Sequence, residues 1–301
     1  MKVKNINKTV SFLFLLFFCL SLAPQSSQAE EKKLLIGLIP EMNIFKQKQR
    51  FKPLGEYLSK KIGMEVKFTI LSRYGNIIDS FRKERMDGAF FGSFTGAAAV
   101  HKLGVIPLVR PVNLDNTSTY QGYIFVRKDS NIKDVKDMKG KKMAFVEKAT
   151  TAGYVFPVAY LKEHGVSSYE GFFREYYFTG SHDAAVEAVL NRKADIGAAK
   201  HSMYDRLRKE DPRIDRDLVI LARSPWVPSN GLCIRKDLGA ATAKKIKDTL
   251  LNMDTDPEGR NVLKEFGALK FIETTEKDYD PVHDMAEKAG IDLKKYKWRN
   301  E

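Results

Sequence analysis

The sequence predicts an α/β fold made of two similar halves, and three observations support this prediction. First, 43% of the 301 residues are apolar and 30% are charged, which suits a soluble protein with a large core. Second, short apolar runs alternate with apolar residues at helical spacing from Leu34 onward. Third, an offset of 108 residues sets Leu35 on Met143 and Asp87 on Asp195, with the same expected order of strands and helices around both.

The first 29 residues form a predicted secretory signal peptide. Lys2, Lys4 and Lys8 give a basic start, Val10–Ala23 is an almost continuous apolar run, and Ser27–Ala29 supplies small residues at the cleavage positions. The apolar run covers 14 residues, fewer than the roughly 20 that cross a bilayer. The mature protein is therefore expected in the periplasm.

The two cysteines favour neither a lipid anchor nor a disulfide. Cys19 lies inside the apolar run, behind Phe17 and Phe18 instead of the small residues of a lipoprotein signal. Removal of the signal peptide would leave Cys233 alone, so no internal disulfide is expected.

The basic balance of the chain favours anionic partners without indicating nucleic acid. The net charge is +13, and it would be +10 after removal of the signal peptide. The lysines are spread along the chain, and the sequence shows no zinc-finger, helix-turn-helix or base-stacking motif. The preferred interpretation is a solvated basic surface that attracts small anions, and nucleic acid is not an expected partner.

The first half of the chain predicts strands separated by helices. The expected strands are Leu34–Ile39, Val66–Leu71, Asp87–Phe91, Val105–Val112 and Tyr120–Val126. The helical spacing is carried by Phe51, Leu54, Leu58 and Ile62, and then by Ile77, Ile78 and Phe81. The polar stretch Asn113–Thr119 is the first expected crossing between the halves.

The middle of the chain repeats this plan, and the end is expected to be mainly helical. The expected strands are Met143–Val146, Tyr176–Thr179, Asp195–Ala199, Leu218–Ala222 and Leu232–Arg235, with helices at Thr150–Glu163 and around Ala185–Leu190. The turn-rich segment Ser224–Gly231 is the second expected crossing. Helices broken at Pro257, Gly267, Pro281 and Gly290 are expected from Ala240 to Glu301.

Two crossings assign the two ends of the chain to one lobe and the middle to the other. The expected division is a signal peptide at 1–29, lobe I at 30–117 plus 228–301, and lobe II at 118–227. A ligand cleft is expected between the lobes, spanned by two hinges.

Polar residues at the start of a helix give the most informative candidate site, because ligands of open α/β sheets bind beyond the carboxyl ends of the strands. The segment Ala149–Tyr154 follows an expected strand and begins an expected helix. The hydroxyls of Thr150 and Thr151, followed by the small residues Ala152 and Gly153, could present donors and free N–H groups to one anion. Ordinary N-capping by the same threonines is the alternative, and spacing alone leaves both open.

The next helix is preceded by the contiguous residues Ser181, His182 and Asp183. Because the groups of a hydrolase triad must converge from different directions, this run does not predict one. Ser181 or Asp183 could cap the helix. His182 would then lie near the mouth of the cleft, either as a ligand or as a surface histidine.

The matching positions of the first half are Met42–Asn43, Tyr74, and Ser93 within Gly92–Gly96. Small and hydroxyl residues there allow close approach of a ligand to the backbone, and helix packing against the sheet is the alternative. Tyr120, beside the first crossing, could close over a ligand or fill the linker.

The sequence predicts no metal, cofactor or catalytic site. The five histidines include no pair at the i, i+4 spacing of a zinc helix, and no CxxC occurs. P-loop and dinucleotide-binding glycine motifs are also missing from the sequence, as is a visible nucleophile–base pair.

Several motifs together point to a known family. They are Asp129-Ser130 followed by Asp137–Gly140, Thr150–Tyr154 with Pro157, Gly180–Asp183, Asp195–Gly197, and Ser224-Pro225 with Pro228. In this order and spacing, the chain from about Leu34 to Phe271 resembles the phosphate/phosphite/phosphonate-binding subunits of bacterial ABC importers, a branch of the type II periplasmic binding proteins. The resemblance implies two lobes, each a mixed sheet flanked by helices, joined by two hinge crossings.

The resemblance also implies roles for individual residues. In the family, hydroxyl and N–H groups corresponding to Thr150 and Thr151, a histidine matching His182, and tyrosines matching Tyr74 and Tyr120 hold the oxygens on phosphorus.

Three positions depart from the members that bind an aminoalkyl phosphonate. The acidic residues that face the ammonium group there correspond to Ser202 and Asn230 here, and the usual serine of the cradle corresponds to Ala152. The resemblance therefore favours phosphate, phosphite or a simple alkylphosphonate as the ligand.

The expected mechanism is hinge closure. The anion would dock on the helix that begins at Thr150, and closure would bring Tyr74 and the Ser93 loop over it. The expected partners are ABC permease subunits of the inner membrane, and the protein is expected to act as a monomer. The alternative is a periplasmic sensor that signals to a membrane kinase, and an exported enzyme is a third reading. Whether Lys200 and His201 reach the pocket stays open in the sequence.

Overall fold

Two mixed sheets and one two-stranded ribbon organise the computed structural model, which describes residues 33–297. The expected signal peptide, residues 1–29, lies outside the described residues. The six-stranded sheet has the order β13-β4-β12-β3-β1-β2, and the five-stranded sheet has the order β10-β6-β9-β7-β8.

The six-stranded sheet is built from both ends of the described chain. Its strands are β1 (Lys33–Leu38), β2 (Glu65–Ile70), β3 (Gly88–Phe91), β4 (Ile106–Asn113), β12 (Gly231–Ile234) and β13 (Ala268–Glu273). The helices of these segments are α2 (Ile44–Ile62), η1 (Tyr74–Asn76), α3 (Ile77–Lys83), α4 (Ser93–Leu103), α9 (Ala240–Leu251), η5 (Met253–Thr255), α10 (Pro257–Phe266), η6 (Glu276–Tyr279) and α11 (Asp280–Lys288).

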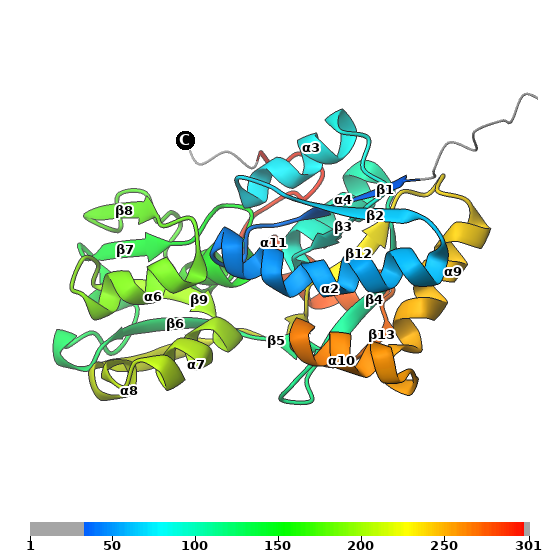
Figure 1. Ribbon diagram of the computed structural model, residues 1–301. Helices are drawn as coiled ribbons and strands as arrows, with labels where there is room; N and C mark the ends of the chain where they lie inside the picture. The colour runs from blue at the N-terminus through cyan, green and yellow to red at the C-terminus, as the bar shows by residue number, and fades with distance from the viewer. Residues whose placement is uncertain (1–32, 298–301) are drawn as a thin grey trace, which may run out of the picture. The chain divides into compact units, whose positions relative to one another are not determined.

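The five-stranded sheet comes from the middle of the chain. Its strands are β6 (Gly122–Arg127), β7 (Lys142–Phe145), β8 (Glu175–Phe178), β9 (Ile196–Lys200) and β10 (Leu218–Arg223). The helices of this part are η2 (Lys128–Ser130), η3 (Lys136–Met138), η4 (Thr151–Val155), α5 (Phe156–Glu163), α6 (His182–Leu190), α7 (His201–Glu210) and α8 (Arg213–Asp217). In Figure 1, α6 lies along β7 and β9, against which it packs.

The two crossings between the sheets are paired with each other. β5 (Thr119–Tyr120) and β11 (Val227–Pro228) form an antiparallel ribbon, in which Tyr120 faces Val227 and Thr119 faces Pro228. The chain thus leaves the six-stranded sheet after β4 and returns to it at β12, as the polar and turn-rich segments predict. The expected division into two lobes, with its boundaries, stays a prediction.

The two sheets share a core pattern of strands. β1 lies between its parallel neighbours β2 and β3, and β7 lies between its parallel neighbours β8 and β9. In the first sheet Leu35 N donates to Asp87 Oδ2 at 2.9 Å, and in the second Lys142 N donates to Asp195 Oδ2 at 2.8 Å. The offset of 108 therefore holds for the aspartates, whereas the strands before them are displaced by one residue.

Helix α2 shows why these residues form the elements that position the site. Asn43 caps its first turn by accepting hydrogen bonds from Phe45 N and Lys46 N, and Gly63 ends it with a φ of 69°, which glycine adopts without strain. The residues at helical spacing from Phe51 to Ile62 are buried against β2 and α10 (Figure 1). The N-terminal part of α2 lies beside the end of β1, because Gln47 Nε2 donates to Ile39 O at 2.7 Å.

The last part of the chain is mainly helical, as expected, but it differs from the expectation in two details. The strand β13 was not predicted. A bulge between Ala268 and Lys270 breaks its alternation, and its burial pattern carries no period of two, so the local strand signal is lost. Pro281 lies in the first turn of α11, where proline is tolerated, and therefore does not break a helix.

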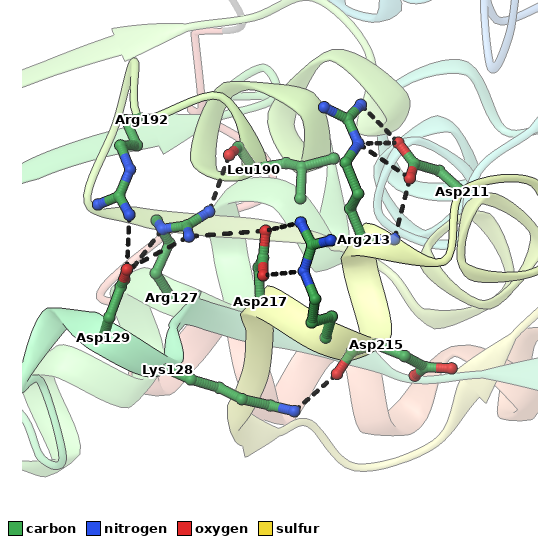
Figure 2. Close-up of polar contacts among 10 residues, drawn as sticks. Arg127, Lys128, Asp129, Leu190, Arg192, Asp211, Arg213, Asp215 and Asp217 are labelled. Atoms are coloured by element: carbon green, nitrogen blue, oxygen red, sulfur yellow. Dashed lines mark hydrogen bonds and ion pairs between the residues drawn. The ribbon is translucent and has the colours of Figure 1, made fainter.

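An ion-pair network ties the ends of β6, α6 and α8 together (Figure 2). Arg127 Nη1 donates to Leu190 O at 2.9 Å, and its guanidinium lies 3.0 Å from Asp129 Oδ1 and 3.6 Å from Asp217 Oδ2. Hydrogen bonds from Arg216, together with the charge of Arg127, lower the pKa of Asp217 to about 2. These contacts support the outer edge of the five-stranded sheet, away from the strand ends that carry the site.

Among the described residues, no helix combines the length and the apolar character needed to cross a membrane.

Candidate ligand-binding site

Three buried hydroxyls meet where segments of the two sheets approach each other. Ser93, the first residue of α4, has its Oγ 2.5 Å from Tyr120 OH and 2.7 Å from Thr151 Oγ1. Phe94 N donates to the same Thr151 oxygen at 3.0 Å. Ser93 belongs to the six-stranded part, Thr151 begins η4 of the five-stranded part, and Tyr120 lies in the ribbon between them.

The three linked hydroxyls of Ser93, Tyr120 and Thr151, called here the hydroxyl chain, have one more O–H proton than the hydrogen bonds between them require. Ser93, Tyr120 and Thr151 carry three O–H protons, and two hydrogen bonds join the three oxygens. Thr151 Oγ1 is in addition an acceptor for a backbone N–H. The chain can therefore donate one hydrogen bond to an acceptor outside it.

Tyr74 supplies a second available donor. Its side chain is 3% exposed, and its OH forms no hydrogen bond with the described residues. Burial raises the pKa of Tyr74 well above its usual range, and the nearby carboxylates of Glu41 and Glu147 act in the same direction, so the hydroxyl keeps its proton. A buried hydroxyl without a partner is unfavourable, and an incoming acceptor removes that penalty.

His182 supplies a third donor, in the neutral form. Its Nδ1 accepts a hydrogen bond from Lys200 N at 3.2 Å, which leaves the proton of the neutral ring on Nε2. Burial and the charge of Lys200 lower the pKa of His182 to about 4, against the effects of Glu41 and Asp183. Its ring stands edge-on to that of Tyr74, with the centroids 6.1 Å apart, so the two donors are neighbours.

The residues at the start of the helix that begins at Thr151 have different structural roles. Thr150 Oγ1 donates back to Glu147 O at 2.6 Å, so this hydroxyl serves the loop. Val155 N donates to Thr150 O, a π-helical bond, and the N–H groups before it have no acceptor within the helix. Ala152 is buried in the first turn. Gly153 is required by packing, because a Cβ there would stand 2.4 Å from the Val146 side chain.

A largely buried ion pair borders this cluster. Lys200 Nζ lies 3.1 Å from Glu41 Oε1 and 4.5 Å from the centre of the Tyr120 ring. Burial acts to raise the pKa of Glu41, but the charges of Lys200 and Arg50 outweigh it, and the pKa is lowered. The lysine charge is therefore matched within the protein.

A cavity of about 760 Å³ adjoins the ion pair. Glu41 and Lys200 line it, together with His201 and the predicted site residues Ser202 and Asn230. Lys200 and His201, whose position relative to the ligand the sequence left open, both line this cavity. Met42 lines the cavity as well, whereas its neighbour Asn43 caps α2.

Sequence reasoning missed Glu41 and Glu147. Both lie within three residues of the carboxyl end of a strand, β1 or β7, in the loops that drew attention to Met42 and Thr150. Burial raises the pKa of Glu147, while the N–H groups of Gly75 and Tyr74 oppose that shift. Strand ends were therefore a sufficient signal for both carboxylates.

Metal ligation finds no support in the part of the chain that the structure describes. No group of three or more histidine, cysteine, aspartate or glutamate side chains there could hold a metal ion. Cys233 is buried and free.

The fold is that of the type II periplasmic binding proteins, α/β proteins with two mixed sheets joined by two crossings. The chain is similar to the crystal structure of a binding protein component of an ABC phosphonate transporter from Pseudomonas aeruginosa, with a TM-score of 0.77, 22% identity and 87% of each chain covered. It is also similar to PhnD1 from Prochlorococcus marinus in complex with methylphosphonate, with a TM-score of 0.75, 24% identity, and 86% of this chain and 99% of that chain covered.

Sequence comparison shows the family within this fold. Residues 36–279 match the family described as ABC transporter, phosphonate, periplasmic substrate-binding protein, and the chain belongs to it. A phosphonates-binding periplasmic protein of Escherichia coli is 25% identical, over 94% of this chain and 85% of the relative. A probable phosphite-binding protein of Prochlorococcus marinus is 26% identical over 85% of this chain and 90% of the relative, and a phosphate-import protein of Mycolicibacterium smegmatis is 33% identical over 61% and 60%.

Proposed function

We propose that this protein captures a small phosphorus oxyanion, namely phosphate, phosphite or a simple alkylphosphonate, in the periplasm and delivers it to an ABC importer. One observation carries the proposal. Tyr74 OH, His182 Nε2 and one proton of the hydroxyl chain are donors without an acceptor among the described residues. A tetrahedral oxyanion presents several acceptor oxygens and could engage all three.

Neutral donors suit a carrier that must release its cargo. Hydrogen bonds to a charged group contribute roughly 1.5–3 kcal/mol each, so three or four of them hold an anion without a permanent positive charge. Lys200, whose ammonium group borders the cluster, is already paired with Glu41. The N–H groups at the start of η4 add a favourable dipole for the same anion.

The relatives support the proposed ligand class. They are named for phosphonate, phosphite and phosphate, and one neighbouring structure contains methylphosphonate. These anions share a tetrahedral phosphorus with at least two terminal oxygens. Ser202 and Asn230, which line the adjoining cavity, offer no carboxylate for the ammonium group of an aminoalkyl phosphonate.

Closure of the two halves around the ligand is the proposed mechanism. Ser93 and Thr151 come from different sheets and touch each other, and Glu41 and Lys200 also bridge the two parts. The paired ribbon of β5 and β11 is short, so bending there separates these contacts with little loss of structure. An oxyanion bound at Thr151 would take over part of the bonding that Ser93 and Tyr120 now share.

Isothermal titration of the processed protein tests the proposal. Methylphosphonate, phosphite and phosphate are titrated separately, with sulfate as the tetrahedral control that lacks phosphorus. We expect saturable binding of at least one phosphorus anion at a 1:1 ratio and weaker binding of sulfate. Absence of heat with all three phosphorus anions, at concentrations up to several millimolar, would show that the ligand assignment is wrong.

A further inference from the structure

The cavity beside the proposed anion site is larger than the proposed ligands need. It has a volume of about 760 Å³, whereas methylphosphonate has five heavy atoms, and a water molecule occupies about 30 Å³ in the liquid. Glu41, Lys200 and Asn230 line the cavity, and so do residues of α2 and of α7. A substituent on phosphorus would have room to enter it.

Most of the acidic side chains that line the cavity have a hydrogen-bond or ion-pair partner within the protein. Its basic side chains are Lys46, Arg50, Lys200, Arg206 and Lys209, and its acidic side chains are Glu41, Asp115, Asp205 and Glu265. Three of the carboxylates have partners: Glu41 pairs with Lys200, Asp205 with Arg208, and Asp115 accepts from Thr117 N. Glu265 is then the one unpaired carboxylate among these lining residues.

Arg50 presents half of its guanidinium to this space. Its Nε donates to Phe266 O at 2.6 Å, and its Cζ lies 4.4 Å from the centre of the Phe266 ring. Its two terminal nitrogens form no hydrogen bond or ion pair with the described residues. The side chain is therefore held in place while its planar fork stays available, the geometry that suits a carboxylate or phosphate.

Arg206 faces the same space from the other half of the molecule. Its Nε is buried without a hydrogen bond, and the nearest carboxylate oxygen, on Glu210, lies 3.7 Å away, beyond hydrogen-bond distance. Burial and the charge of Arg206 lower the pKa of Arg50, against the effect of Glu41. Two guanidinium groups with unmet hydrogen-bonding capacity thus repel each other across the cavity.

We propose that Arg50 and Arg206 bind a second anionic group on the ligand, so that the preferred cargo is a phosphonate whose substituent ends in a carboxylate. The inference rests on the proposed function and narrows its ligand class. An anion between the two arginines relieves their repulsion and satisfies the buried Nε of Arg206. It also links α2 to α7, so binding of the tail favours the closed arrangement.

Matched ligands test the proposal directly. Phosphonoacetate and 3-phosphonopropionate carry an anionic tail, ethylphosphonate and propylphosphonate are their neutral counterparts, and 2-aminoethylphosphonate carries a cation. We expect at least one anionic-tail ligand to bind 10-fold or more tightly than its neutral counterpart, and the cationic ligand to bind most weakly. If the neutral ligands bind equally well or better, the inference is overturned while the proposed function stands. If no phosphorus compound binds, both are overturned.

A pair of arginine variants assigns the preference to Arg206. Arg206→Gln should reduce the affinity ratio of anionic-tail to neutral ligand about 10-fold. Arg213→Gln, in the neighbouring helix α8, removes an arginine that pairs with Asp211; neither residue lines the cavity, so this variant should keep the wild-type ratio. An unchanged ratio in Arg206→Gln, with circular dichroism showing intact folding, would exclude this residue from ligand recognition.

Discussion

Ser93 Oγ and Thr151 Oγ1 lie 2.7 Å apart, although 57 residues separate them in the chain and each begins a helix of a different half. Both hydroxyls are buried, and Tyr120 OH extends the contact to the ribbon that joins the halves. The two halves thus touch at the same hydroxyls that have an O–H proton available for a further hydrogen bond. We therefore expect ligand binding and closure to be coupled, because the same oxygens would take part in both.

Thr151→Val should weaken anion binding about 10- to 100-fold. Valine keeps the shape of threonine but removes the hydroxyl, and one hydrogen bond to a charged ligand contributes roughly 1.5–3 kcal/mol. The measurement is titration calorimetry with methylphosphonate.

Thr150→Val is the matched control for this substitution. The Thr150 hydroxyl donates to Glu147 O, so its removal should lower the free energy of unfolding by about 1 kcal/mol and change affinity less than Thr151→Val does. A larger loss of affinity in Thr150→Val than in Thr151→Val would contradict the division of roles between the two threonines.

Tyr74→Phe should weaken binding about 10- to 100-fold and at the same time stabilise the free protein. The hydroxyl is buried without a partner, and leaving a buried polar group unsatisfied costs about 1–3 kcal/mol. Its removal should therefore raise the free energy of unfolding by about 1 kcal/mol in urea denaturation.

Tyr57→Phe provides the opposite control. Tyr57 lies near the C-terminal end of α2, and its OH donates to Asp256 Oδ2 at 2.8 Å. Neither residue lines the cavity, so this variant should lose stability and keep its affinity. Equal behaviour of the two tyrosine variants would show that Tyr74 has no special relation to the ligand.

Most of the fold could be predicted from the sequence because strand and helix periodicity are local properties. The strand β13 could not, since its bulge and exposed residues remove the alternation that identifies a strand. The bond between Asp87 and Leu35 N, repeated by Asp195 and Lys142 N, has no periodic signal at all. A single offset between the two halves of the sequence could therefore not predict that their strands are displaced by one residue.

Some features of the candidate site could be predicted from the sequence, and others could not. Ser93, Tyr120 and Thr151 converge because strand ends and helix starts collect at one edge of each sheet. The hydrogen bond from the Thr150 hydroxyl to Glu147 O depends on one side-chain rotamer, which no sequence pattern specifies. The ion pair of Glu41 and Lys200 could not be predicted, because it depends on how the two halves are placed against each other. Arg206 could not be predicted either, because in the sequence it does not differ from a solvent-exposed charged residue of a helix.

Breaking the largely buried pair of Glu41 and Lys200 should destabilise the protein. Lys200→Met leaves the carboxylate of Glu41, which is 14% exposed, without its partner, and such a loss costs at most about 3–5 kcal/mol. Combining Glu41→Gln with Lys200→Met should recover at least 1 kcal/mol relative to the sum of the single effects. Urea denaturation of the four proteins in this cycle measures the coupling, and strict additivity would show that the two charges do not interact.

The free protein should lose stability between about pH 6.5 and pH 4 because of His182. Burial lowers the pKa of His182 from its ordinary value of 6.5 to about 4, so in this range the unfolded chain binds a proton that the folded protein does not. The contribution of the neutral ring is fully present above pH 6.5 and is lost as the pH falls toward 4, by about 2 kcal/mol at pH 5. His182→Asn cannot titrate, so its unfolding free energy should fall less than that of the wild type between pH 7 and pH 5, by urea denaturation in matched buffers. Parallel pH dependence of the two proteins would show that His182 does not change its proton affinity on folding, and the assignment of a neutral Nε2 donor would then lose its support.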